Sequence, residues 1–163
     1  MEIRSAVITG GAGFVGGAIC RALQERHKNC RITIIDLRKP IIGPVTDERL
    51  SYVEADITCP LNISDAIRSA SPEVVFHSAG IVPPLSERYS RGMADLVSRI
   101  NVEGTQNTID AAEAAGCAAL VYTSSCTAVI DDMSRDYANI DETWPVSLKS
   151  SIYGESKVID DFE

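Results

Sequence analysis

A tyrosine and a lysine four positions apart, Tyr153 and Lys157, are the residues best suited to move a proton. Residues with this spacing share one face of a helix, so their side chains would be neighbours if the segment is helical. A free tyrosine has a pKa of about 10 and is a weak base at neutral pH, but a nearby cation favours its phenolate form. The pair predicts acid–base chemistry, although the same spacing also occurs on ordinary helix surfaces.

A second group with chemical potential is the glycine triplet at residues 10, 13 and 16. Gly10 permits a tight turn, Gly13 lets the backbone approach a pyrophosphate, and Gly16 lets a helix lie close to a sheet. Phe14 and Val15 stand in the first turn of that helix, whose N-terminus offers free N–H groups to phosphates. The spacing therefore predicts that these five residues form a dinucleotide-binding turn.

The glycine triplet alone is weak evidence, and Asp36 strengthens it. This residue follows Gly16 by 20 positions and ends the second apolar run. A carboxylate there accepts hydrogen bonds from the adenosine ribose hydroxyls and repels a 2′-phosphate, which favours NAD over NADP. Arg38 and Lys39 directly follow and leave NADP open.

Alternating strands and helices must position these residues. Short apolar runs predict strands at residues 3–9, 31–36, 50–54, 73–77 and 118–124. Helical periodicity predicts helices at residues 14–28, 62–70 and 91–115, and the beginning of another within 150–163. Residues 37–49, with Pro40, Gly43 and Pro44, and residues 126–149 are predicted as loops. The pattern predicts an α/β fold: a Rossmann-type doubly wound parallel sheet in the order 3-2-1-4-5, with helices on both faces.

Composition excludes several functional classes. The chain has 163 residues and a formal net charge of −8, without the clustered lysines and arginines that nucleic acid requires. No apolar run approaches the ~18 residues of a membrane span, and the N-terminus lacks a signal-peptide pattern, so we expect a cytoplasmic location. Five scattered cysteines form no CxxC pair, which indicates reduced thiols and no metal site.

Six motifs in this order resemble the extended short-chain dehydrogenase/reductase family, which also contains NAD-dependent epimerases and dehydratases. They are the glycine turn, Asp56-Ile57, His77-Ser78-Ala79-Gly80, Asn101-Val102-Glu103-Gly104-Thr105-Gln106-Asn107, Val121-Tyr122-Thr123-Ser124-Ser125 and Tyr153-Gly154-Glu155-Ser156-Lys157. Within the family, these motifs are most similar to the 3β-hydroxysteroid dehydrogenase and sterol-4α-carboxylate 3-dehydrogenase branch, although the segment Cys126-Thr127-Ala128-Val129-Ile130-Asp131 departs from it.

The resemblance implies an NAD-dependent enzyme that oxidises a secondary alcohol, the 3β-hydroxyl of a steroid or sterol. Hydride transfer to nicotinamide requires a group that moves the hydroxyl proton, and this role falls to Tyr153. Lys157 would favour the phenolate and hold the nicotinamide ribose. Ser125 would donate a hydrogen bond to the substrate oxygen, with Ser124 as its rival.

The same resemblance implies further cofactor contacts, made by Tyr153 and Lys157 themselves and by Asp56, Ile57, Ala79, Gly80 and Asn101. His77 is expected to position its loop and not to catalyse. Asn101 and Asn107 either face solvent or tie their helix to neighbouring backbone groups. We expect the dinucleotide to run from the glycine turn past Asp36 to Tyr153.

Two other interpretations stay open. A nucleotide-sugar epimerase or dehydratase uses the same Tyr, Lys and Ser, whereas a non-catalytic dinucleotide sensor tends to lose the Tyr–Lys pair. The resemblance further implies that residues 1–163 form one nucleotide-binding domain, that the remaining strands and the substrate domain are absent, and that the protein forms a homodimer.

Overall fold

The computed structural model describes residues 2–38, 47–87, 90–130, 134, 136, 138–141, 143–146 and 151–158. The chain divides into two compact units. Unit 1 comprises Met1–Gly80 and Glu103–Thr123, and unit 2 comprises Ile81–Val102 and Ser124–Glu163. Among the described helices, none is long and apolar enough to cross a bilayer.

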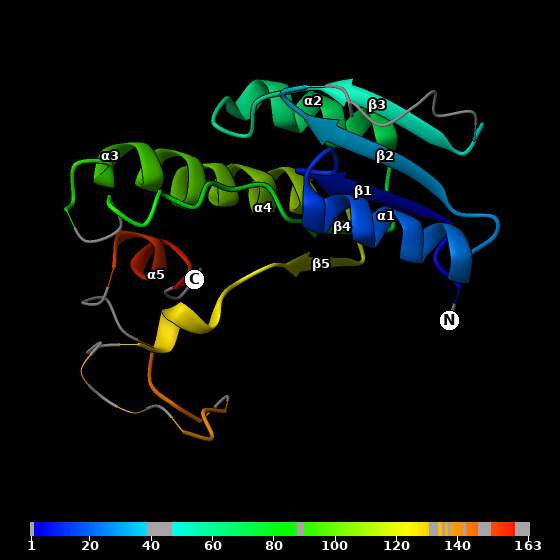
Figure 1. Cartoon of the computed structure of the whole chain (residues 1–163). Helices are drawn as coiled ribbons and strands as arrows, with labels where there is room; N and C mark the ends of the chain where they lie inside the picture. The colour runs from blue at the N-terminus through cyan, green and yellow to red at the C-terminus, as the bar shows by residue number, and fades with distance from the viewer. Residues whose placement is uncertain are drawn as a thin grey trace. The chain divides into compact units, whose positions relative to one another are not determined.

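Unit 1 is built on a five-stranded parallel sheet in the order β3-β2-β1-β4-β5 (Figure 1). The strands are β1 (Ser5–Thr9), β2 (Arg31–Asp36), β3 (Leu50–Glu54), β4 (Val74–His77) and β5 (Ala119–Tyr122). All five residues of the central strand β1 are buried, as its continuous apolar run predicts for a strand covered on both faces. The predicted fold and strand order are confirmed. Because the strands are parallel, their carboxyl ends share one edge of the sheet.

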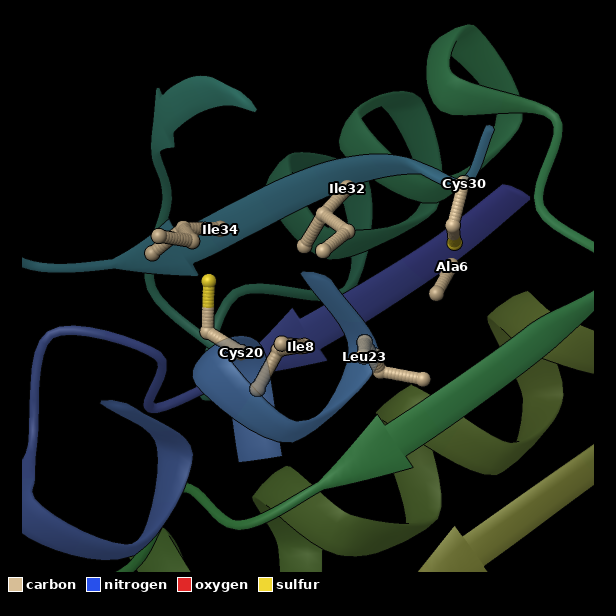
Figure 2. Close-up of a cluster of buried hydrophobic side chains, with 7 residues drawn as sticks. All are labelled: Ala6, Ile8, Cys20, Leu23, Cys30, Ile32 and Ile34. Atoms are coloured by element: carbon tan, nitrogen blue, oxygen red, sulfur yellow. The ribbon is translucent and has the colours of Figure 1, made fainter. Parts of the chain in front are cut away.

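Helices cover both faces of this sheet. Helix α1 (Phe14–Arg26) lies on one face, and α2 (Pro60–Ala70) and α4 (Gly104–Ala114) pack together on the other (Figures 1 and 2). Figure 2 shows the apolar cluster between α1 and the sheet, formed by Ala6, Ile8, Cys20, Leu23, Cys30, Ile32 and Ile34. Two cysteines therefore serve as small core residues, and burial raises the pKa of both thiols.

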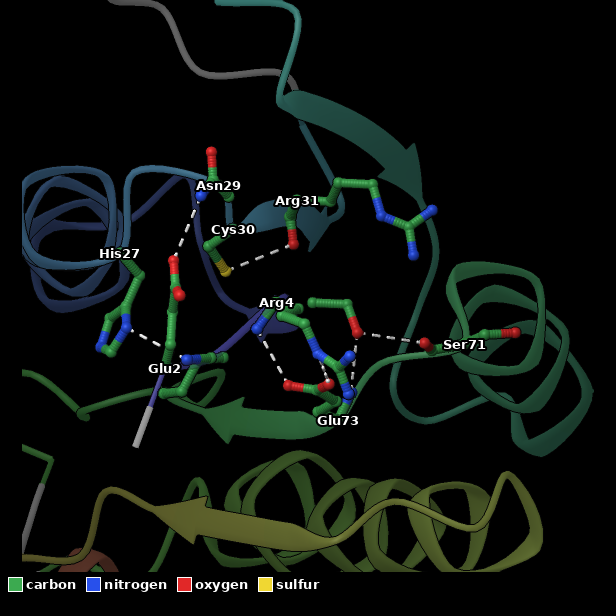
Figure 3. A network of polar contacts seen from close by, with 10 residues as sticks. Glu2, Arg4, His27, Asn29, Cys30, Arg31, Ser71 and Glu73 are labelled. Carbon is green, nitrogen blue, oxygen red and sulfur yellow. Dashed lines mark hydrogen bonds and ion pairs between the residues drawn. The ribbon is translucent and has the colours of Figure 1, made fainter.

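Polar contacts fasten the amino-terminal edge of the sheet (Figure 3). The backbone N–H of Arg4 donates to Glu73 Oε2 at 2.9 Å, and its Nε donates to Oε1 at 2.7 Å. His27 Nδ1 accepts from the Ile3 N–H at 3.1 Å. These contacts tie the entries of β1 and β4 and the end of α1 together, at the edge opposite the one where parallel sheets bind ligands.

Unit 2 contains short helices. They are α3 (Ala94–Val97), the 3-10 helix η2 (Cys126–Val129) and α5 (Ile152–Ser156). Helix α5 packs against η2 and also contacts α3.

The predicted long helix over residues 91–115 is wrong in two respects. It begins only at α3, because Arg91 has a left-handed backbone with φ +58°. It then changes to a π-helix, η1 (Ser98–Glu103), before α4. The π-turn buries Asn101, and a periodicity argument does not distinguish it from an α-helix.

Smaller differences concern element ends. Helix α2 begins at Pro60, two residues before the prediction, because proline suits the first helical position. Strand β5 ends at Tyr122 and not at Ser124. Helix α5 covers only part of the predicted range 150–163, of which residues 150 and 159–163 lie outside the described part. Lys39, Pro40, Gly43 and Pro44 also lie outside it.

Candidate active site

The glycine turn between β1 and α1 has a conformation that requires glycine. Gly10 has φ +68°, and a Cβ there would stand 2.7 Å from the Cα of Ala79. A Cβ on Gly16 would stand 2.4 Å from the carbonyl oxygen of Gly10. Both distances are far below van der Waals contact, so these glycines are fixed by packing in unit 1.

The turn after β4 packs directly on the glycine turn. The Ser78 N–H and hydroxyl both donate to the carbonyl of Thr9, at 3.1 and 2.8 Å. The Ala79 N–H donates to Thr9 Oγ1 at 3.4 Å. The structure thus brings Gly10 and Ala79, two predicted cofactor residues, into contact, and the exposed Gly80 follows them.

Asp36 holds the glycine turn as well as ending β2. Its Oδ2 accepts from the Ala12 N–H at 3.1 Å, and its Oδ1 accepts from the Leu37 N–H at 2.8 Å. Its backbone carbonyl accepts from the hydroxyl of Tyr52 on β3 at 2.9 Å. A carboxylate has room for further donors, so Asp36 can organise the turn and still accept hydroxyl groups of a ligand. Sequence spacing found Asp36 but missed its bond to Ala12 and its anchor, Tyr52.

The open side of the turn is the N-terminus of α1. Gly13 is the N-cap residue, and its carbonyl accepts the Gly17 N–H at 2.9 Å. Phe14 is 92% exposed and Val15 is 45% exposed, although both are apolar. The first turn of α1 therefore leaves two apolar side chains exposed beside the backbone N–H groups of a helix N-terminus, while its contact with a phosphate stays a prediction.

Asp56 and Ile57 lie beyond β3 and have other contacts. Asp56 Oδ1 accepts from the N–H and the hydroxyl of Thr58, at 2.8 and 2.9 Å, which caps a local turn. Ile57 is buried, and its carbonyl accepts from the side-chain amide of Asn107 on α4 at 2.9 Å. Asn107 is thus a tie to neighbouring backbone, whereas the role of Asp56 and Ile57 toward an adenine stays a prediction.

His77 is a buried residue at the end of β4, within the sheet and not in the loop that it is expected to position. Its Nδ1 lies 2.6 Å from Thr9 Oγ1, and its Nε2 lies 2.9 Å from Thr105 Oγ1. Its ring stacks on Tyr122 at a centroid distance of 5.6 Å. The imidazole joins β1, β4, β5 and α4 and has no exposed surface. Thr9 and Thr105 were missed, because a lone threonine gives no sequence signal for a buried polar contact.

Unit 2 holds the tyrosine and the lysine. Lys157 follows the last residue of α5, and its Nζ lies 5.8 Å from the centre of the Tyr153 ring. The expected proximity of the two side chains is confirmed, at a distance that permits a cation–π contact. Lys157 is only 6% exposed, and this burial lowers its pKa. Desolvation disfavours the ammonium form, so the charge of Lys157 is poorly solvated and lies beside the phenol of Tyr153.

Two serines before η2 differ in their hydrogen bonds. Ser124 donates to the backbone carbonyl of Lys157 at 2.8 Å and so ties this segment to the end of α5. Ser125 lies three residues after β5, not within it. Its Oγ accepts from the N–H and the hydroxyl of Thr127, at 3.2 and 2.9 Å. As an acceptor in both bonds, Ser125 keeps its proton for donation, whereas the proton of Ser124 is committed.

Asn101 clamps the segment after the β4 turn. Its Oδ1 accepts from the Ile81 N–H at 2.8 Å, and its Nδ2 donates to the Ile81 carbonyl at 2.9 Å. The same Nδ2 donates to Ser156 Oγ at 2.9 Å, and Ser156 donates to the Tyr153 carbonyl at 2.8 Å. Asn101 is therefore a positioning residue for the helix that carries Tyr153. Its contact with a cofactor stays a prediction.

Comparisons with known proteins agree with this arrangement. Residues 7–161 match the model of the 3-beta hydroxysteroid dehydrogenase/isomerase family. The chain is 30% identical over 163 residues to a decarboxylating sterol-4-alpha-carboxylate 3-dehydrogenase of Candida albicans, an alignment that covers 96% of this chain and 44% of that protein. It is 32% identical over 164 residues to a 3-beta-hydroxysteroid dehydrogenase of Mycolicibacterium neoaurum, covering 97% and 42%.

Among solved structures, the chain resembles a short-chain dehydrogenase/reductase superfamily protein from Agrobacterium tumefaciens with bound NAD. The TM-score is 0.75 at 27% identity, over 94% of this chain and 42% of that one. It also resembles Bordetella bronchiseptica WbmG in complex with NAD and UDP, with a TM-score of 0.78 at 24% identity, over 96% and 47%. The chain therefore spans less than half the length of these relatives.

Proposed function

This chain belongs to the 3-beta hydroxysteroid dehydrogenase/isomerase family, and on that premise we propose that it is the dinucleotide-binding part of an NAD-dependent oxidoreductase. The reaction is the oxidation of a secondary alcohol, the 3β-hydroxyl of a steroid or sterol. The observation that carries the proposal is the bond between Asp36 and the Ala12 N–H, which joins to the glycine turn the carboxylate that would bind the ribose.

The residues present fit NAD. An added Cβ on Gly10 or Gly16 would collide with backbone atoms. A Cβ on Gly13 would stand 3.1 Å from the carbonyl oxygen of Gly10. The turn is thus closely packed on its inner side, with the N-terminus of α1 exposed beside it for a pyrophosphate. Asp36 would take the adenosine ribose and oppose a 2′-phosphate, which favours NAD over NADP. The solved relative with bound NAD supports this choice.

Three residues of unit 2 would carry the proton chemistry. Nicotinamide, when bound, supplies the hydride acceptor. Tyr153 would take the proton from the substrate hydroxyl at its phenolic oxygen, and the Lys157 ammonium would favour the phenolate. Ser125 would donate its remaining proton to the substrate oxygen, and Ser124, bound to the Lys157 carbonyl, would hold the segment in place. The buried Lys157 is what supports this assignment over a surface Tyr–Lys pair.

The names of the relatives support a choice of substrate class. Proteins named sterol-4-alpha-carboxylate 3-dehydrogenase and 3-beta-hydroxysteroid dehydrogenase match nearly the whole chain at 30–32% identity. The likeness to WbmG, which binds UDP, is below 25% identity and supports the fold only. We therefore favour a sterol over a nucleotide sugar.

Two measurements test the proposal. Calorimetric titration of NADH and NADPH into the chain should give saturable binding that is tighter for NADH, and Asp36→Ala should weaken NADH binding. A panel of 3β-hydroxysteroids and UDP-sugars, incubated with NAD and the longest available form of the protein, should give NADH with the steroids. Turnover of UDP-sugars alone would replace the sterol assignment by that of an epimerase or dehydratase. Binding without turnover of either class would indicate a sensor.

A further inference from the structure

Helix α5 needs outside support to hold Tyr153 in place. It has five residues, Ile152–Ser156, far fewer than an isolated helix requires in water. The Ser151 hydroxyl caps it by accepting the Gly154 N–H at 3.0 Å, but a cap stabilises one turn without fixing its direction. The orientation of α5 must come from contacts with other segments of unit 2.

One such contact with a defined geometry is a two-pronged ion pair between Arg91 and Glu155. Arg91 Nη1 donates to Glu155 Oε1 at 3.0 Å, and Nη2 donates to Oε2 at 2.9 Å. Two parallel bonds between planar groups fix rotation as well as distance. The Glu155 side chain is 19% exposed and that of Arg91 is 63% exposed, so the carboxylate is the better-buried partner.

Glu155 is well placed to transmit this constraint. It stands midway in the chain between Tyr153 and Lys157, two residues from each. Residues two apart on a helix do not share a face, so Glu155 holds α5 from a side other than the one that presents the tyrosine and lysine. The Asn101–Ser156 bond at 2.9 Å anchors a neighbouring position on α5.

The backbone of Arg91 is an independent sign that this contact is specific. Its φ of +58° lies in the left-handed region, which is uncommon for a long side chain. Its carbonyl accepts the Ala94 N–H at 3.1 Å, just before α3. Strained residues persist where their surroundings determine them, and they concentrate at functional sites. This residue combines an uncommon backbone conformation with the paired contact to Glu155.

We propose that Arg91 is a positioning residue, whose fork-like pairing with Glu155 sets the orientation of α5 and thereby the placement of Tyr153 and Lys157. This inference rests on the proposed function, in which Tyr153 and Lys157 handle the proton. Arg91 touches neither cofactor nor substrate in this role. An ion pair this exposed contributes little to global stability, so its effect is expected in turnover and not in folding.

The test compares Arg91→Ala, Arg91→Lys and Arg91→Gly in whichever form of the protein oxidises the sterol. Arg91→Ala should lower kcat by roughly 10- to 100-fold, as expected for a small displacement of reacting groups, with KM for NAD and the melting temperature little changed. Arg91→Lys keeps the charge but loses the fork, and should recover only part of kcat. Arg91→Gly relieves the left-handed backbone and should be as slow as Arg91→Ala. The matched control is Arg68→Ala, which removes an exposed arginine ion pair on α2.

Exchanging the two charges of the ion pair tests whether kcat can be restored. Arg91→Glu combined with Glu155→Arg should restore kcat above either single variant, because the two charges face each other again. A wild-type kcat in Arg91→Ala or Arg91→Gly overturns the inference, as does a lowered melting temperature with unchanged kcat per folded molecule. Tyr153→Phe distinguishes a failure of the positioning role of Arg91 from a failure of the proposed function. If it abolishes turnover while Arg91→Ala does not, the positioning role fails and the function stands; if it retains turnover, the proposed function fails.

Discussion

At Lys157 the proposed chemistry and the stability of the folded protein have opposite requirements. The proposed role needs a positive charge at this position, whereas burying that charge lowers the stability of the fold. Burial lowers its pKa below the usual value of about 10.4 for a lysine. Between the folded and the unfolded pKa, the unfolded chain binds more protons, so the stability of the folded protein rises with pH across this window. Below the folded pKa, the full desolvation cost is present.

We therefore predict that Lys157→Met stabilises the chain at pH 7, since it removes a buried charge and keeps the volume. The advantage should shrink as the pH rises toward the unfolded pKa, because the wild-type lysine then loses its proton. Urea unfolding of both proteins at pH 7 and pH 10 measures this, and other titrating groups cancel in the difference. An advantage that is constant or grows with pH contradicts the prediction.

The glycine turn separates residues that serve folding from residues that serve binding. Gly10→Ala places a Cβ 2.7 Å from Ala79 on a left-handed backbone and should cost about 2 kcal/mol or more of unfolding free energy. Gly13 has an ordinary φ of −81°, and its Cβ would meet one carbonyl at 3.1 Å.

Gly13→Ala should therefore lose much less unfolding free energy than Gly10→Ala, yet bind NADH about tenfold more weakly than the wild type, a loss of about 1.4 kcal/mol. An equal loss of unfolding free energy in both variants would show that Gly10 and Gly13 do not differ in their roles in folding and in binding.

At the scale of elements, buried polar contacts determine how helices meet the sheet. Thr105 on α4 lies 2.9 Å from His77 Nε2, inside a region without solvent. Thr105→Val preserves shape but removes this contact, and should cost about 1–3 kcal/mol. The control is Thr33→Val, which removes a threonine–serine contact between β2 and β3 near the surface. Thermal unfolding of the two variants compares them, and an equal small loss in both would refute the structural role of His77.

The strands and most helices could be predicted from periodicity, because β1, β2 and β4 are apolar runs and α1 has a clear buried stripe. The π-turn at Ser98–Glu103 could not, since its residues follow an ordinary helical pattern. Within the described residues α5 ends at Ser156 with Lys157 as its C-cap, an end that the helical pattern of the sequence does not mark. Ends shift where proline or a left-handed residue intervenes, as at Pro60 and Arg91.

The candidate site was predictable only where spacing encodes geometry. Gly10, Gly16 and Asp36 stand at fixed offsets from strand ends, and Tyr153 and Lys157 at one helical turn. Arg91 and Glu155 are 64 residues apart, and no local pattern connects two such positions. Long-range pairs of this kind arise from tertiary packing, so they require a structure.

At the scale of the whole molecule, the chain spans 44% of the Candida albicans relative and 42% of the Mycolicibacterium neoaurum relative. We predict that the 163-residue chain binds NADH but turns over sterol slowly or not at all. Adding the length that the relatives possess should restore turnover. Rapid sterol oxidation by the 163-residue chain would refute the prediction that these residues bind NADH without turning over sterol. Sedimentation of the same samples tests the homodimer that the family resemblance suggests.

The most direct measurement of the central claim is the rate of NADH formation from a 3β-hydroxysterol by a form of the protein that turns over sterol, compared with the same form carrying Tyr153→Phe. With Tyr153 as the group that moves the proton, kcat should fall by about 10²- to 10⁴-fold, while the dissociation constant for NADH stays close to that of the wild type. A Tyr153→Phe variant that oxidises the sterol within a few-fold of the wild-type rate would contradict the account.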